Sequence, residues 1–292
     1  MPGVTAGREA PAPSVLAVFA HPDDESLACG GLLSWCTALG VRTSLLCLTH
    51  GEHADHARVD PDGEKPTPSA APETNAAASP LAAVRARELR AAAAVLGLDD
   101  VTLLAHEDGM LPWINAARLE QDILETIERT AADVIITFDE DGLYWHPDHI
   151  AVHDRTIGAI AACQAGNPAL YYVSLPPGAM RAVVDHAVAV SATRASIAAS
   201  PTHVLGVADA DAFGAGAPPP SLVLDTGRFA RQKLLALQCH RSQIRDNDAL
   251  TLVTLAASPR LLGVEHYRRA EVGSGGETFL DRLAPAPEHR AR

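Results

Sequence analysis

The sequence is poor in several kinds of residue, and each shortage narrows the class of protein. Only two of the 292 residues are lysine, and acidic residues outnumber basic ones by 36 to 23, which gives a formal net charge of −13. An acidic surface argues against nucleic acids and anionic membranes as partners. No segment approaches the 18 consecutive apolar residues that indicate a membrane-spanning helix. We therefore expect neither a nucleic-acid partner nor a membrane partner.

Cysteine patterns and glycine-rich motifs are also scarce. The five cysteines include no Cys-x-x-Cys pair, which predicts reduced thiols in a cytoplasmic protein. The first 13 residues lack the apolar core of a secretory signal and are expected to form a disordered lead-in. The absence of G-x-G-x-x-G and G-x-x-x-x-G-K-[ST] argues against a dinucleotide site and a phosphate-binding P-loop.

Buried-strand patterns alternate with helical patterns through most of the chain. Short apolar runs rich in β-branched residues predict strands at 14–20, 41–49, 100–105, 132–138 and 169–175. Helical patterns occur between them, at 26–40, 81–98, 116–131 and 147–163. This order predicts an α/β fold, a Rossmann-like and mostly parallel sheet with helices on both faces.

The predicted organisation is a Rossmann-like catalytic core over residues 14–175 with a smaller, irregular C-terminal extension. Residues 53–80 are rich in proline, alanine and charge, and we expect them to form a mobile loop or lid within the core. Residues 176–280 form the extension, which we expect to complete the site, and residues 281–292 form a frayed tail.

Polar clusters follow four of the predicted strands, at 21–25, 50–52, 106–110 and 139–149. Ligands of parallel sheets bind beyond the carboxyl ends of the strands. We therefore expect the four clusters to meet at one edge of the sheet.

Two of these clusters contain the tripeptide His-Pro-Asp. In the first, His21 and Asp24 are three residues apart and can face one divalent ion, which leaves Asp23 free to act on a bound water. Spacing alone does not decide whether Asp23 or Asp24 is the ligand, and either could simply cap the following helix.

The second cluster supplies a third candidate ligand, His149, at the start of a helix. Two histidines, one carboxylate and an open position for water are typical of a catalytic zinc site, and ferrous iron also suits this ligand set. His153, one helical turn later, is a rival third ligand.

The motifs "AHPDDE" and "HPDH" together resemble those of the PIG-L (LmbE-like) family of metal-dependent N-deacetylases. The segments "LTHGE", "RARELRAAAAVLG", "EDGM", "LYWHPDH" and "CHRSQ" are similar to further landmarks of that family. The resemblance covers residues 14–175 and, more loosely, 228–270, and it is weak at 53–80 and 176–225.

The resemblance implies a role for each matching residue. His21, Asp24 and His149 would bind zinc, and Asp23 would be the general base. His146, as an imidazolium, and Tyr144 would stabilise the developing oxyanion. Family members hold substrate hydroxyls at the positions of Arg85 and Asp108. We also place Glu52, at a strand end, and His240, at the rim of the site, among the candidate substrate-binding residues.

The predicted function is therefore a zinc-dependent hydrolase that removes the acetyl group from an N-acetylglucosaminyl-type amino sugar. One alternative is an amidase that cleaves a larger acyl group or a thiol conjugate. Another, from a different class, is a sugar-binding protein without turnover. The expected partner is a small N-acylated amino sugar, and the oligomeric state, a homo-oligomer included, stays open.

Overall fold

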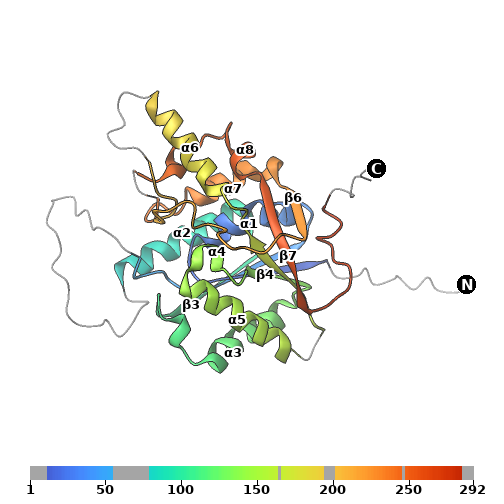
Figure 1. Ribbon diagram of the computed structural model, residues 1–292. Helices are drawn as coiled ribbons and strands as arrows, with labels where there is room; N and C mark the ends of the chain where they lie inside the picture. Colours follow the sequence, from blue (N-terminus) through green and yellow to red (C-terminus); the bar gives the residue numbers. More distant parts are fainter. Residues whose placement is uncertain (1–11, 55–78, 164–165, 194–200, 245–246, 285–292) are drawn as a thin grey trace, which may run out of the picture.

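The computed structural model describes residues 12–54, 79–163, 166–193, 201–244 and 247–284. Most of the predicted lead-in, most of the predicted loop at 53–80 and the last eight residues therefore lie outside the described residues. The predicted α/β class is confirmed: strands and helices alternate, and helices lie on both sides of one sheet (Figure 1).

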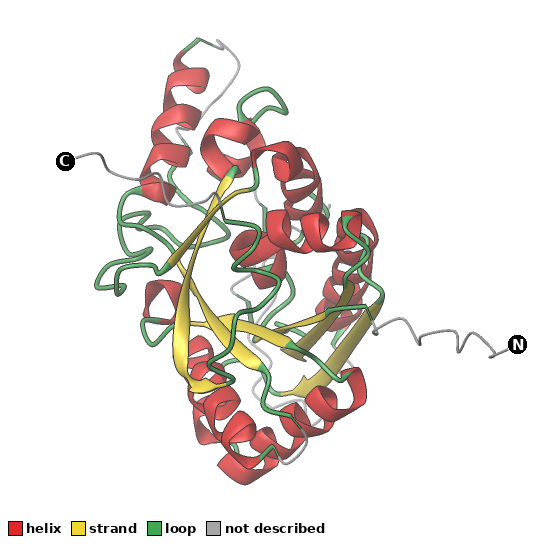
Figure 2. Cartoon of the chain, turned by 90° about the vertical axis from the view of Figure 1, so that its right-hand side faces the viewer, coloured by secondary structure: helices red, strands yellow, loops and turns green. Residues whose placement is uncertain are grey.

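The sheet has seven strands in the order β3-β2-β1-β4-β5-β7-β6. Five are parallel and come from the predicted core: β1 (Ser14–Phe19), β2 (Arg42–Thr49), β3 (Asp100–His106), β4 (Val134–Phe138) and β5 (Ala169–Ser174). Two strands from the extension, β6 (Leu222–Asp225) and β7 (Val264–Gly273), add to the edge in antiparallel fashion. Figure 2 shows the twisted sheet between its helices.

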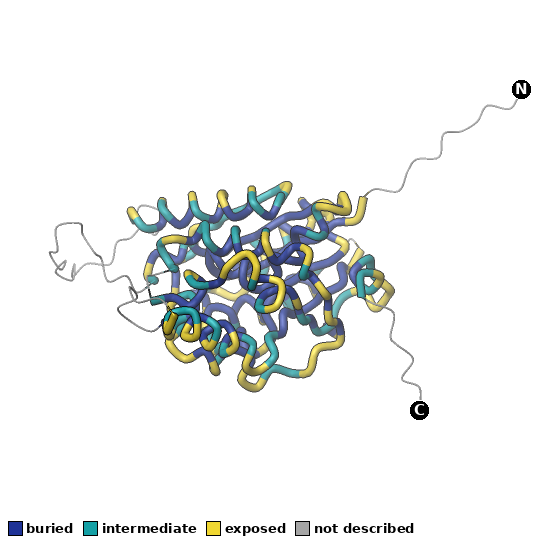
Figure 3. Tube along the Cα trace, turned by 90° about the horizontal axis from the view of Figure 1, so that it is seen from above, coloured by how far each residue is buried: buried dark blue, intermediate teal, exposed yellow. Residues whose placement is uncertain are grey.

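The central strands form because their residues are apolar and mostly β-branched or bulky, which suits a strand buried on both faces. All six residues of β1 are buried. Val15 of β1 lies between Thr43 of β2 and Val134 of β4, so β1 is flanked on both sides. Burial is greatest along this central layer (Figure 3).

Two groups of helices cover the sheet. On one face lie α1 (Asp24–Ala38), α2 (Pro80–Leu96) and α7 (Ala230–Leu237), and on the other lie α3 (Ala116–Thr130) and α5 (Pro147–Ala162) (Figure 1). The remaining helices are the short α4 (Gly142–Trp145), α6 (Ala179–Ala192) and α8 (Ser258–Leu262), with 3₁₀ turns at Leu111–Trp113, Gly227–Phe229 and Ala249–Leu252. Among the described helices, none has the length and apolar character needed to cross a membrane.

The extension packs directly on the core. A second apolar cluster joins Leu27 of α1 to Val183 of α6, Phe213 and Leu234 of α7. The extension also supplies β7, whose Glu265 carboxylate is buried under α1. There it accepts the N–H groups of Gly31 and Leu32, both at 2.8 Å. The extension therefore belongs to the same sheet and the same buried interior as the core.

Glu265 also accepts Lys233 Nζ at 2.6 Å, and both side chains are buried. Removing one partner of a buried ion pair leaves an uncompensated charge, so Glu265→Gln should lower the free energy of unfolding by about 3–5 kcal/mol. Urea denaturation of the variant and the wild-type protein measures this difference. A loss below about 1 kcal/mol, the level of an exposed pair, would contradict this account of the packing.

Candidate functional site

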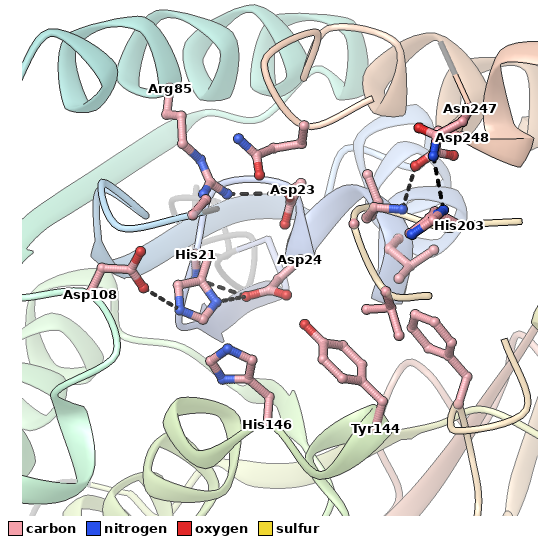
Figure 4. A pocket seen from close by; sticks show the side chains of 17 residues that line it. His21, Asp23, Asp24, Arg85, Asp108, Tyr144, His146, His203, Asn247 and Asp248 are labelled. Carbon is pink, nitrogen blue, oxygen red and sulfur yellow. Dashed lines mark hydrogen bonds and ion pairs between the residues drawn. The ribbon is translucent and has the colours of Figure 1, made fainter. Parts of the chain in front are cut away.

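The turn after β1 presents two carboxylates in different directions. α1 begins at Asp24, whose Oδ2 accepts the backbone N–H of His21 at 2.8 Å. Asp23 precedes the helix with φ 118° and ψ −25°, outside the regions that non-glycine residues normally occupy. As a result Asp24 points toward His21, and Asp23 points toward Arg85 (Figure 4).

The loop after β4 places the second group of residues. Gly142, Leu143 and Trp145 all have positive φ, which folds the short α4 back over the start of α5. His149 follows in the first turn of α5, fully buried, with its ring stacked on Phe138 at a centroid distance of 3.9 Å.

The two segments bring three candidate ligands together, as predicted. His21 Nδ1 lies 3.1 Å from His149 Nε2 and 3.5 Å from Asp24 Oδ2, and His149 Nε2 lies 3.3 Å from Asp24 Oδ1. A tetrahedral ion with bonds of about 2.0–2.1 Å holds its ligand atoms about 3.4 Å apart. These spacings therefore fit one divalent cation.

Hydrogen bonds on the far side of the His21 and His149 rings orient the opposite ring nitrogens toward the position between these histidines and Asp24. His149 Nδ1 lies 3.0 Å from the carbonyl oxygen of Gly142, which can only accept, so Nδ1 carries the proton and Nε2 the lone pair. His21 Nε2 faces the carboxylates of Asp108 at 3.0 Å and Asp148 at 3.2 Å, which favours a proton on Nε2 and a lone pair on Nδ1. When His21 is neutral, two lone pairs and a carboxylate converge, which is unfavourable without a positive charge between them.

The electrostatics of the cluster favour such a charge. Burial tends to lower the pKa of His21, but the carboxylates of Asp108, Asp148 and Asp24 outweigh it and hold that pKa well above its ordinary value. Burial likewise tends to raise the pKa of Asp24, yet His149 and His21 lower it to about 2. Burial lowers the pKa of His149 to about 3, so this ring is neutral, as a metal ligand must be.

Two further groups have ligand atoms close enough for a metal: His21 with His146 and His149, which contains both proposed histidine ligands, and His21 with Asp108 and Asp148. The Asp148 oxygens, however, already accept the backbone N–H groups of Gly109 at 2.8 Å and Leu111 at 3.2 Å. This cluster therefore acts as the outer support that orients His21. Sequence analysis assigned no role to Asp148, although its place between the two motif histidines was a signal.

His153 does not join either cluster. Its Nδ1 lies 3.0 Å from the carbonyl oxygen of Phe138, and its ring packs near Tyr172. The geometry leaves His149, and not His153, as the candidate third ligand.

Asp23 and Arg85 line the cavity beside the ligand cluster. Burial raises the pKa of Asp23 to about 7, against the opposing effect of Arg85. A carboxyl group with a pKa near neutrality suits general acid–base catalysis. Arg85 directs its two Nη atoms to the carbonyl oxygens of Gly51 and Pro22 and to Asp23 Oδ2, so it braces the turn as well as facing the cavity.

His146 and Tyr144 lie on the opposite wall (Figure 4). His146 Nδ1 accepts the backbone N–H of Asp148 at 3.2 Å and so caps α5. The family resemblance predicts an imidazolium here, but this hydrogen bond requires an unprotonated Nδ1, and burial together with His21 lowers the pKa of His146. The structure therefore favours a neutral ring whose Nε2–H is the donor. Burial raises the pKa of Tyr144 well above its ordinary value, which keeps its hydroxyl protonated.

Two residues predicted to bind substrate do not line the cavity. Glu52 is buried and accepts the backbone N–H of Asp108 at 3.0 Å, so it supports a cavity residue from behind. His240 is fully buried and pairs with Glu25 at 3.0 Å. Asp108, by contrast, does line the cavity, as predicted.

The cavity has a volume of about 420 Å³ and continues past the ligand cluster into the C-terminal extension. We call the part beyond the cluster the distal wing. Its walls are His203, Leu205, Gly206, Val207, Phe213, Gln243, Asn247 and Asp248.

The chain is similar in sequence or in fold to several known proteins. Residues 16–160 match the family model described as GlcNAc-PI de-N-acetylase (PIG-L). The chain is 31% identical over 272 residues to a 1D-myo-inositol 2-acetamido-2-deoxy-alpha-D-glucopyranoside deacetylase from Acidothermus cellulolyticus, and the match covers 87% of each chain.

Two solved structures show that the fold alone does not decide the reaction. The 4-carboxy-2-hydroxymuconate hydratase from Pseudomonas putida matches with a TM-score of 0.59 and 17% identity, over 91% of this chain and 99% of that one. The N,N'-diacetylchitobiose deacetylase from Pyrococcus horikoshii matches with a TM-score of 0.56 and 18% identity, over 89% and 84%. Since one is a hydratase and the other a deacetylase, function must be argued from the site residues.

The ligand assignment predicts a graded response to substitution. His149→Ala should weaken metal binding by more than about 100-fold, whereas Asp148→Asn, which alters an outer support, should cost about 10- to 100-fold. His153→Ala should retain a full equivalent of metal. Emission spectrometry on dialysed proteins gives the metal content, and a full equivalent in His149→Ala would show that the third ligand is another residue.

Proposed function

The chain belongs to the PIG-L family of de-N-acetylases, and on this premise we propose that it removes the acetyl group from an N-acetylglucosaminyl-type amino sugar. The products are acetate and a free amine, so the enzyme is an amidohydrolase. One observation carries the proposal: two imidazole nitrogens and a carboxylate converge beside the carboxyl group of Asp23, at the wall of a cavity.

His21, Asp24 and His149 would hold the metal ion. When bound, a divalent cation lowers the pKa of a water molecule and polarises the amide carbonyl. Asp23 takes a proton from the attacking water as general base and then delivers it to the departing amine. Arg85 keeps the Asp23 carboxyl group oriented through the contact at 3.2 Å.

His146 and Tyr144 act on the amide oxygen. The Nε2–H of a neutral His146 and the hydroxyl of Tyr144 can both donate to this oxygen as it gains negative charge. Asp108 holds a sugar hydroxyl, while Glu52 fixes the backbone of Asp108 from behind.

We propose zinc as the metal, because two histidines, one carboxylate and an open position are typical of catalytic zinc sites. Ferrous iron suits the same donors. Restoring activity to chelator-treated protein with each metal under anaerobic conditions decides between them.

The proposed substrate has a second ring attached to the amino sugar. The relative from Acidothermus cellulolyticus is named as a deacetylase of an inositol glycoside. The distal wing combines polar groups, such as Asn247 and His203, with the apolar walls of Leu205 and Phe213. Hydroxylated rings present both polar edges and C–H faces, so an inositol-type ring matches this lining.

Two further assignments concern the location of the protein in the cell and the size of the acyl group. None of the five cysteines, all of which lie in the described part of the chain, forms a disulfide, which supports a cytoplasmic location. A larger acyl group in the distal wing is the competing interpretation, and it predicts that N-acyl chains longer than acetyl are hydrolysed faster.

The general-base assignment is tested by Asp23→Asn. The variant keeps the shape of the side chain but cannot accept a proton, so kcat should fall by about 10²- to 10⁴-fold while the metal content stays at one equivalent. Acetate release from N-acetylglucosaminyl-inositol measures kcat. Unchanged turnover would remove Asp23 from this role.

The proposed binding of the second ring in the distal wing is tested by Asn247→Ala. Loss of one hydrogen bond, worth about 0.5–1.5 kcal/mol, should raise KM for N-acetylglucosaminyl-inositol up to about tenfold. The KM for N-acetylglucosamine, which lacks the second ring, should stay the same. Equal changes for both substrates would contradict the assignment.

A further inference from the structure

The backbone of Asp23 is strained at the residue that we assign as the base. Among the described non-glycine residues with positive φ, Asp23 has the largest value, 118°. Such conformations are costly and persist only where the surroundings enforce them. The contacts that enforce this one therefore control where the carboxyl group points.

Contacts on both sides of the peptide unit hold Asp23 in place. Its N–H donates to Glu25 Oε2 at 3.0 Å, and its carbonyl oxygen accepts the N–H groups of Ser26 at 3.1 Å and Leu27 at 3.0 Å. The bonds to the carbonyl oxygen belong to the start of α1, and any sequence in this helix could make them. The bond to the N–H needs the side chain of Glu25.

Glu25 is in turn held by a residue from the extension, 215 positions away. His240 Nε2 lies 3.0 Å from Glu25 Oε1, and both residues are completely buried. Ser26 Oγ donates to the same Oε1 at 2.6 Å. A buried carboxylate needs such partners to stay charged and in place. One oxygen of Glu25 is thus anchored, and the other is aimed at Asp23.

Neither Glu25 nor His240 lines the cavity among the described residues, so neither touches the substrate. We propose that the buried Glu25–His240 pair is a positioning device for Asp23: it fixes the strained peptide of the base and so the direction of its carboxyl group. The proposal rests on the proposed function, in which Asp23 is the base. It gives the C-terminal extension a part in catalysis without contact with the reacting atoms.

The chain offers a matched control in the Lys233–Glu265 pair. Like Glu25 and His240, Lys233 and Glu265 are both buried and in contact. Glu265 also joins the extension to α1, because it accepts the backbone N–H groups of Gly31 and Leu32. Within the described residues, the hydrogen bonds of Glu265 go to Gly31, Leu32, Lys233 and Tyr267, and none goes to the turn at Asp23. Substitution there tests loss of a buried pair without loss of the support for the base.

The experiment compares Glu25→Ala, Glu25→Gln and Glu265→Gln for kcat, KM, metal content and unfolding midpoint. Glu25→Ala should lower kcat about 100-fold, the cost of a small misplacement of a catalytic group, with KM and metal content unchanged. Glu25→Gln keeps an oxygen that can accept the Asp23 N–H. Its kcat should therefore be at least tenfold higher than that of Glu25→Ala. Glu265→Gln should lower the unfolding midpoint but change kcat less than threefold.

Three results would overturn the proposal. One is an equal loss of kcat in Glu25→Ala and Glu265→Gln, which indicates general destabilisation. Another is loss of metal from Glu25→Ala, which places the effect on the ligand Asp24. The third is wild-type kcat in Glu25→Ala.

If Glu25→Ala does not fold, His240→Gln and His240→Leu carry the same test. Glutamine can donate to Glu25 and should preserve kcat, whereas leucine cannot and should lower it. Equal kcat in these two variants contradicts the proposal. A wild-type enzyme that releases no acetate from any N-acetylated amino sugar would instead refute the proposed function, so the two failures are distinguishable.

Discussion

The site depends on two imidazole nitrogens and the two oxygens of one carboxylate, which lie 3.1–3.5 Å apart in a buried place. Without a metal ion, the raised pKa of His21 lets its ring keep a second proton on Nδ1, where it faces the lone pair of His149 and the carboxylate of Asp24. A metal cation bound there would displace this proton, and the spacing is that of a tetrahedral ion. Behind this cluster, the carbonyl oxygen of Gly142 and the carboxylate of Asp148 keep each ring turned the right way.

The sheet explains why segments so far apart in sequence can meet so closely. β1 and β4 are hydrogen-bonded neighbours, so the turns at their carboxyl ends open onto the same place. Each turn then departs from ordinary backbone geometry, at Asp23 in one and at Leu143 and Trp145 in the other. The extension completes the arrangement, because it forms the distal wing of the cavity and buries His240 against Glu25.

The core strands and the convergence of the two His-Pro-Asp motifs could be predicted from the sequence for different reasons. Strands such as β1 are apolar on both faces, and two His-Pro-Asp motifs at strand ends have few structural explanations. The choice of Asp24 over Asp23 depended on the family resemblance, because a φ of 118° cannot be read from residue types. β7 was missed because its sequence, "VEHYRRAEVG", mixes charges with apolar residues and buries Glu265. The roles of Asp148, Glu52 and His240 behind the cavity depend on tertiary contacts that no local pattern encodes.

The central claim is that one divalent cation binds between His21, Asp24 and His149. Anomalous X-ray diffraction at the metal absorption edge, on crystals of the metal-loaded enzyme, locates the ion directly. The account predicts a single peak about 2.0–2.2 Å from His21 Nδ1, His149 Nε2 and an Asp24 carboxylate oxygen. A peak at the other nitrogen of His21, between Asp108 and Asp148, would contradict it.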